Sequence, residues 1–281
     1  MAPGPALTSR HGEDFLILSA FAGQSRGFYI DVGAFDGVYG SNTWALAQSG
    51  WSGICIEPAP EVFPQLTRNR PSALCVEAAC GADDGIATLS IDPTMQFRSV
   101  HSMDRVKKGY ENAIEFRGLD TQAFSSVAVD VVAINGLLRR TRGFREIDLL
   151  NIDAESAVPE VFSGLDLDWY TPRLIVVSSA DESINRWATD RLENAGYDLC
   201  RTIQESWFFA AEPALAKRVR RTAINCFLPR NLHPFGLTHT RLPMRNDRIL
   251  LNGHEYILEE LATHMAGISA SNDAVAVGDG S

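Results

Sequence analysis

The sequence has few of the features that mark membrane, nucleic-acid-binding or disulfide-bonded proteins. None of its apolar runs approaches the roughly 20 residues that a membrane-spanning helix needs. The 281 residues carry a formal net charge of −10, whereas a protein that binds nucleic acid usually has a strong basic excess. The five cysteines are scattered without a CxxC pair, which favours reduced thiols and argues against a structural metal site. A membrane span, a nucleic-acid partner and a disulfide framework are therefore not expected.

The composition is that of an ordinary globular protein, with 45% hydrophobic and 21% charged residues. A chain of this length can bury a full core, so we expect one large domain with appendages. The N-terminal stretch "MAPGPALTSRHGED" has neither the basic nor the apolar region of a signal peptide. Together with the reduced cysteines, this predicts a cytoplasmic location.

The hydrophobic pattern predicts strands that alternate with helices. Short runs that are apolar throughout, separated by helical segments, are typical of a parallel sheet covered on both faces. The stretch "DLCRTIQESWFFAAE" instead reads as two strands joined by a turn, which predicts an antiparallel edge strand. The predicted fold class is α/β, with a mostly parallel central sheet and helices on both faces. The predicted strands are "GFYIDV", "GICIEP", "ALCVEAA", "GIATLSID", "SVAVDVVAI", "IDLLNID" and "RLIVVSS".

The predicted organisation has four parts: an N-terminal helical segment over 1–26, a core over 27–212 with an irregular insertion near 92–126, a basic extension over 213–267, and a disordered tail over 268–281. Between Lys217 and Arg248 there are eight basic residues against one acidic residue, Asp247. This excess could meet an anionic substrate or partner, or fold along the acidic surface of the domain itself. Within the extension, "NGHEYILEELATHMAG" predicts a final helix.

The stretch "GFYIDVGAFDGVYGSNTWAL" carries the main functional signal. A strand ends at Asp31, a G-x-x-x-G loop runs from Gly33 to Gly37 with Asp36 inside it, and a helix follows. The spacing is neither the G-x-G-x-x-G of dinucleotide-binding proteins nor that of a P-loop. Carboxylates in such a loop repel phosphate but accept hydrogen bonds from an ammonium group. The loop therefore suits the cationic amino-acid end of S-adenosylmethionine.

A second acidic residue supports this interpretation. Glu57 in "CIEP" ends the second strand about 20 residues beyond the loop, where a carboxylate can accept both ribose hydroxyls. Taken alone, the loop could be a structural turn and Glu57 a surface acid. Together they predict an adenosylmethionine pocket.

These residues resemble the FkbM-type methyltransferases. The resemblance runs from about Ser9 to Ala211, through "SRHGEDFLIL", the glycine loop, "GWSGICIEPAPEVFPQLTRNRP", "IDLLNIDAESAVPEVFSGLDL" and "TPRLIVV". It implies a Rossmann-like fold and methyl transfer from S-adenosylmethionine, usually to a hydroxyl of a sugar or secondary metabolite. It also implies that "SNT" caps the first helix and lines the pocket, although capping alone would explain these residue types. The expected cofactor-binding residues are Asp31, Gly33, Ala34, Asp36, Gly37, Ser41, Asn42, Thr43, Glu57 and Pro58.

An alcohol that accepts a methyl group has to lose its proton, which calls for a base or a metal ion. Asp153 and Glu155 flank the end of "DLLNID" and are placed for either role, with Mg²⁺ as the expected cation. Alternatively, Glu155 holds the next helix and Asp153 pairs with a cation or an amide. Ser156 stands where the family usually has glycine, which bears on the acceptor. His101 is a third candidate base, because imidazole titrates near neutral pH, or else a surface residue.

The sequence thus predicts an O-methyltransferase that acts on a hydroxyl of a sugar, glycolipid or secondary metabolite. The alternative is a catalytically silent protein that binds adenosylmethionine or a partner, suggested by Ser156 and the basic extension. An NAD-linked oxidoreductase is disfavoured, because the dinucleotide spacing of glycines is missing. A homo-oligomer is left open.

Overall fold

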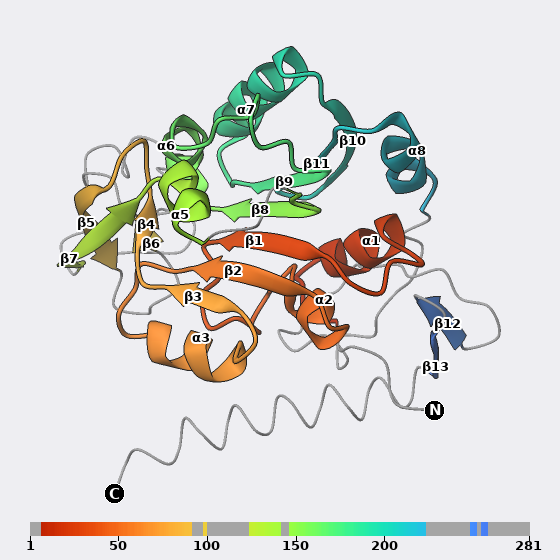
Figure 1. The fold of residues 1–281 in the computed structure, drawn as a ribbon, viewed down its shortest axis with the longest axis horizontal. Coiled ribbons are helices and arrows are strands. Elements are labelled where there is room, and N and C mark those ends of the chain that lie inside the picture. The colour runs from red at the N-terminus through yellow and green to blue at the C-terminus, as the bar shows by residue number, and fades with distance from the viewer. Residues whose placement is uncertain are drawn as a thin grey trace, which may run out of the picture.

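The computed structural model describes residues 7–91, 98–99, 124–141, 146–222, 248–251 and 254–257. Within these residues the main sheet has seven strands in the order β10-β11-β9-β8-β1-β2-β3 (Figure 1). The five strands from β3 to β9 run parallel, and β11 runs antiparallel to both of its neighbours. This confirms the predicted mostly parallel sheet with an antiparallel edge. The bounds are β1 Phe28–Val32, β2 Ser52–Ile56, β3 Leu74–Val76, β8 Leu149–Asp153, β9 Leu174–Ser178, β10 Asp198–Ile203 and β11 Ser206–Ala210.

Helices cover both faces of this sheet. Alternate residues of each central strand accordingly belong to different apolar clusters, one on each face. Tyr29 of β1 belongs to a cluster with α1 (Glu13–Ala20), α2 (Trp44–Gln48) and α8 (Pro213–Arg221). Ile30, the next residue, belongs to a cluster with three other helices. Strand β1 is buried along its whole length, which is why its sequence is nearly continuous in apolar residues. The three helices of the second cluster are α5 Ile134–Arg140, α6 Val158–Ser163 and α7 Glu182–Asn194.

A second, smaller sheet stands at the carboxyl ends of the parallel strands (Figure 1). Its strand order is β4-β7-β5-β6, and it has its own apolar cluster, in which Leu89 and Val129 are buried. Two parts of the segment that we predicted as irregular, near 92–126, are strands: Arg98–Ser99 forms β6, and Ser125 begins β7. His101 lies outside the described residues. The bounds are β4 Ala79–Cys80, β5 Gly85–Ile91, β6 Arg98–Ser99 and β7 Ser125–Val132.

The basic extension begins by folding onto the domain. Helix α8 packs against α1 and β10, with Leu215, Ala216 and Val219 buried in the first cluster. Arg218 donates to the carbonyl of Ala20 at 2.6 Å, at the end of α1, and Arg220 donates to the carbonyl of Leu199 at 3.2 Å. The described start of the extension, residues 213–222, therefore lies along the domain itself.

The end of the chain departs from one prediction. His254–Ile257 forms β13, which pairs with β12 (Arg248–Leu251), so the helix predicted from Asn252 onward is wrong at its start. The expected disordered tail over 268–281 lies outside the described residues. Among the described helices, none has the length and apolar character to cross a membrane. Among all the residues that the structure describes, four cysteines are present and none forms a disulfide: Cys55, Cys75, Cys80 and Cys200.

Candidate active site

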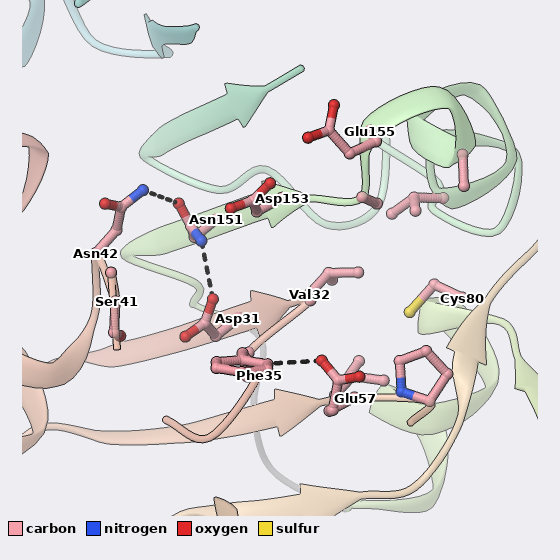
Figure 2. A pocket seen from close by; sticks show the side chains of 18 of the residues that line it. Asp31, Val32, Phe35, Ser41, Asn42, Glu57, Cys80, Asn151, Asp153 and Glu155 are labelled. Carbon is pink, nitrogen blue, oxygen red and sulfur yellow. Dashed lines mark hydrogen bonds between the residues drawn. The ribbon is translucent and has the colours of Figure 1, made fainter. Parts of the chain in front are cut away.

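A cavity of about 710 Å³ opens at the carboxyl ends of β1, β2 and β8. From β1 the chain proceeds through β2 and β3 on one side, and later through β8 and β9 on the other. This reversal of strand order is where open α/β sheets bind their ligands. Figure 2 shows Asp153 and Glu155 on one side of the cavity and Glu57 on the other. The cavity is lined by nine predicted residues: Asp31, Gly33, Ala34, Ser41, Asn42, Glu57, Pro58, Asp153 and Glu155.

The glycine loop is fastened to the end of β2. The backbone N–H groups of Gly33 and Ala34 both donate to the carbonyl of Ile56, at 2.9 and 3.1 Å. The N–H of Phe35 donates to Oε2 of Glu57 at 2.9 Å (Figure 2). These three donors are therefore already used within the protein. A pyrophosphate would need such groups free, so the geometry agrees with the absence of the dinucleotide spacing.

Glu57 lines the cavity although it is buried. Its two oxygens accept from the backbone N–H groups of Phe35 and Ala59, both at 2.9 Å. These bonds orient the carboxylate at the cavity wall. The wall on the side of the second sheet is largely apolar, with Ala78, Ala79, Cys80, Leu89 and Val161.

A buried network of hydrogen bonds forms the floor of the cavity. Asp31 accepts from Oγ1 of Thr43 at 2.5 Å and from Nδ2 of Asn151 at 2.8 Å. Asn151 in turn accepts from Nδ2 of Asn42 at 3.0 Å (Figure 2). All four side chains are buried, so the network fixes their orientation. Asn151 was missed from the sequence, although a polar residue inside an apolar strand could have marked it.

Asp36 and Gly37, in the second half of the loop, and Thr43, beyond it, are not among the residues that line the cavity. The carboxylate of Asp36 accepts from the N–H groups of Val38 and Tyr39, at 2.8 and 2.7 Å, so it shapes the turn instead of facing a ligand. Thr43 is fully buried beneath the loop. The structure therefore does not place these three predicted cofactor residues in the cavity wall.

Ser41 both lines the cavity and caps the first helix. Its Oγ accepts from the N–H groups of Thr43 and Trp44, at 3.2 and 3.1 Å, where α2 begins. The predicted capping is therefore performed by Ser41, since the side chain of Thr43 makes no capping bond.

The acid pair follows β8. Burial of the Asp153 carboxyl, together with the charge of Glu155, raises the pKa of Asp153 to about 7, against the opposing charge of Arg10. Glu155 has a positive φ of 50°, and its Oε2 accepts from the N–H of Ala180 at 3.0 Å. The Ser156 hydroxyl is buried without a hydrogen-bond partner in the described structure. A carboxyl that titrates near neutral pH is suited to accept a proton.

A narrow polar recess of about 20 Å³ adjoins the cavity beside the acid pair. Arg10 and His11 reach it from the segment before α1, and Glu205 reaches it from the turn between β10 and β11. The positive charge of Arg10 acts to lower the pKa of Asp153. Within the described residues no group of three or more His, Cys, Asp or Glu side chains is arranged to hold a metal ion, so the expected Mg²⁺ site gains no support.

Comparison with known proteins identifies the family. The methyltransferase FkbM domain model matches residues 31–199, which include the glycine loop, Glu57 and the acid pair. The chain belongs to the FkbM methyltransferase family. It is therefore an S-adenosylmethionine-dependent methyltransferase of the FkbM type, as the resemblance of its motifs implied.

Individual relatives of this FkbM methyltransferase are distant. It is 29% identical over 204 residues to methyltransferase sdnD of Sordaria araneosa, a match that covers 64% of this chain and 77% of that protein. A TehB-like S-adenosylmethionine-dependent methyltransferase from Corynebacterium glutamicum aligns with a TM-score of 0.35 at 12% identity, over 72% of this chain and 88% of that one. An O-methyltransferase from Bacillus cereus aligns with a TM-score of 0.35 at 13% identity, over 70% of this chain and 79% of that one. The family assignment rests on the domain match.

Proposed function

We propose that this FkbM methyltransferase is an O-methyltransferase that acts in the cytoplasm on a hydroxyl of a sugar, glycolipid or secondary metabolite. The observation that carries the proposal is the position of Asp153. Its carboxyl lies where the cofactor cavity meets the polar recess, and its pKa is raised to about 7. A hydroxyl must lose a proton as it is methylated, and a base with this pKa accepts protons at physiological pH.

The residues around the cavity fit the cofactor. S-adenosylmethionine supplies an electrophilic methyl group when it is bound. Glu57 would accept the ribose hydroxyls, because its carboxylate lines the cavity at the end of β2. The apolar residues Ala79, Leu89 and Val161 would pack against the adenine. Asp31 would receive the ammonium group, because its carboxylate is held rigidly at the cavity floor. The other predicted cofactor residues that line the cavity are Gly33, Ala34, Ser41, Asn42 and Pro58.

The polar residues beside the acid pair suit a hydroxylated acceptor. Arg10 and His11 supply hydrogen-bond donors, while Glu155 and Glu205 supply acceptors, and all four line the cavity as well as the recess. The recess itself has room for about one water-sized group, so the acceptor would lie in the cavity and meet these side chains there. In this arrangement Asp153 takes the proton, and Glu155 acts on it by keeping its pKa high.

The test is the variant Asp153→Asn. We expect methyl transfer from labelled S-adenosylmethionine, measured over a panel of hydroxylated acceptors, to fall about 100-fold or more, which is the contribution typical of a general base. Calorimetry should show that S-adenosylhomocysteine still binds, because Asn151 and Thr43, not Asp153, fix the cavity floor. In the wild type the rate should rise with pH up to about 7 and then level off, as Asp153 loses its proton.

The matched control is Asp168→Asn, at an exposed position outside the cavity wall, which should leave rate and binding unchanged. Undiminished transfer by Asp153→Asn would remove this residue from the mechanism. A wild-type protein that binds S-adenosylhomocysteine but methylates no acceptor would instead favour the silent, cofactor-binding alternative.

A further inference from the structure

Arg70 is a buried arginine that lies behind the glycine loop and outside the cavity wall. It follows α3 (Phe63–Asn69), and its side chain is 1% exposed. We propose that Arg70 is a positioning residue: it fixes the cofactor loop from behind and thereby sets the affinity for the adenosyl cofactor. The inference rests on the cofactor assignment, but not on the identity of the acceptor.

The guanidinium joins three segments that surround the site. Its Nε donates to the carbonyl of Gly37 in the loop at 2.7 Å. Its Nη2 donates to Ser41 Oγ at 2.7 Å and to Thr43 Oγ1 at 2.9 Å, where α2 begins. Its Nη1 donates to the hydroxyl of Tyr29 on β1 at 3.0 Å. A rigid, planar fork can bond to all of these acceptors only in one arrangement of the loop.

The positive charge of the buried Arg70 guanidinium makes these hydrogen bonds necessary. In the part of the chain that the structure describes, Arg70 takes part in no ion pair with a carboxylate. Instead its charge lies over the rings of Trp44 and Tyr29, 5.2 and 5.8 Å from the ring centroids. A buried charge is costly unless its hydrogen bonds are made, so displacement of the loop would leave Arg70 unsatisfied. The loop is therefore held in one position before a ligand arrives.

The effect reaches the cavity through Thr43. Its Oγ1 accepts from Arg70 and donates to Asp31, which lines the cavity floor.

The side chain of Arg70 also packs against Gly37, the last glycine of the loop. A Cβ at Gly37 would lie 2.8 Å from Arg70 Cγ and 2.9 Å from Leu66 Cδ1. Glycine is favoured here by its φ of +81° and by the packing of Arg70 and Leu66, and Gly37 does not line the cavity.

The experiment compares Arg70→Lys with Arg173→Lys. Lysine keeps the charge but presents a single ammonium group, which cannot span the four acceptors. Arg173 is a matched control, since it bonds to Asp148 at 2.8 Å, Glu212 at 2.7 Å and Gln24 at 3.0 Å and does not line the cavity. Both variants are examined by calorimetry with S-adenosylhomocysteine, by thermal denaturation, and by hydrogen exchange over residues 33–43.

For Arg70→Lys we expect the Kd for S-adenosylhomocysteine to rise about tenfold or more, because a hydrogen bond to a charged group is worth at least that factor. Amide exchange over residues 33–43 should also be faster without any ligand. Arg173→Lys should lower the melting temperature but leave Kd and loop exchange unchanged. Tyr29→Phe removes one acceptor of Arg70 and should shift both readouts in the same direction by less.

The proposal is overturned if Arg70→Lys binds S-adenosylhomocysteine as the wild type does, or if Arg173→Lys loses as much affinity. Should Arg70→Lys fail to fold, unchanged Kd and exchange in Tyr29→Phe would overturn it as well. The exchange measurement needs no ligand. If the wild type does not bind S-adenosylhomocysteine, the cofactor assignment fails, while the loop exchange still decides whether Arg70 fixes the loop.

Discussion

At the scale of single residues, Gly33 sets how closely the first strand can approach the eighth at the cavity. It has a φ of +80°, and a Cβ at this position would overlap the backbone carbonyl oxygen of Asp153. Neither the conformation nor the contact tolerates a side chain. Because Gly33 has no Cβ, the loop can lie against the backbone of Asp153, the candidate base.

We therefore expect Gly33→Ala to destabilise the protein by more than the strain of a left-handed alanine, which is about 1 kcal/mol or more. Gly50→Ala is the control, since Gly50 has a similar φ of +87° but no atom within 4 Å of the place that the new methyl group would take. Urea denaturation should show a clearly larger loss for Gly33→Ala, accompanied by weaker binding of S-adenosylhomocysteine. Equal losses in the two variants would mean that the loop moves aside without cost.

At the scale of elements, one face of the main sheet changes character along its strands. Tyr29 and Leu149 lie in the apolar cluster beneath α1 and α2, whereas two residues further on the same face carries Asp31 and Asn151. Because side chains alternate along a strand, residues i and i+2 share a face. On this face, the strands therefore contribute to the hydrophobic core near their amino ends and to the candidate active site at their carboxyl ends.

This pattern explains what the sequence could predict. Apolar runs indicated the strands, and an acid at the end of a run, as at Asp31 and Glu57, indicated the site, because both signals are local. Arg70 was not predicted, since its partner Gly37 is 33 positions away and only the fold brings them together. The strand at His254–Ile257 was missed for a similar reason, because pairing with β12 overrides a helical pattern.

The segment before α1 provides a prediction at the scale of elements. Asp14 holds it in place: Oδ2 accepts from the N–H groups of Thr8 and Ser9, at 2.6 and 3.0 Å, and Oδ1 accepts from Ser9 Oγ and the N–H of Phe15, at 2.5 and 2.8 Å. Both oxygens are required, so Asp14→Asn places an NH₂ group against donors. We expect a loss of about 1–3 kcal/mol in the free energy of unfolding, measured in urea.

The control for Asp14→Asn is Asp166→Asn. There a single oxygen, Oδ1, accepts from the N–H groups of both Asp168 and Trp169, and the side chain is exposed. An asparagine can supply that oxygen, so its stability should stay within about 0.5 kcal/mol of the wild type. Equal stability of the two variants would show that Asp14 does not hold the segment that carries Arg10 and His11.

At the scale of the whole molecule, the charge predicts which ligands the cavity favours. The protein has a net charge of −10, and the cavity is itself lined by carboxylates, among them Asp31, Glu57 and Asp153. An acidic cavity in an acidic protein attracts cations and repels phosphates. The loop donors that could offset this repulsion are already bonded to Ile56 and Glu57.

Thermal denaturation with three ligands tests this selection. S-adenosylmethionine and S-adenosylhomocysteine should each raise the midpoint, since a ligand at ~100 times its Kd adds about 2.7 kcal/mol of stability, whereas NAD should not. The two adenosyl ligands differ by the positive charge of the sulfonium. Raising the salt concentration from about 0.01 to 1 M shortens the screening length from roughly 30 to 3 Å, so it should weaken S-adenosylmethionine more than S-adenosylhomocysteine. A midpoint raised by NAD, or identical salt dependence of the two adenosyl ligands, would show that the carboxylates of the cavity do not select the ligand by its charge.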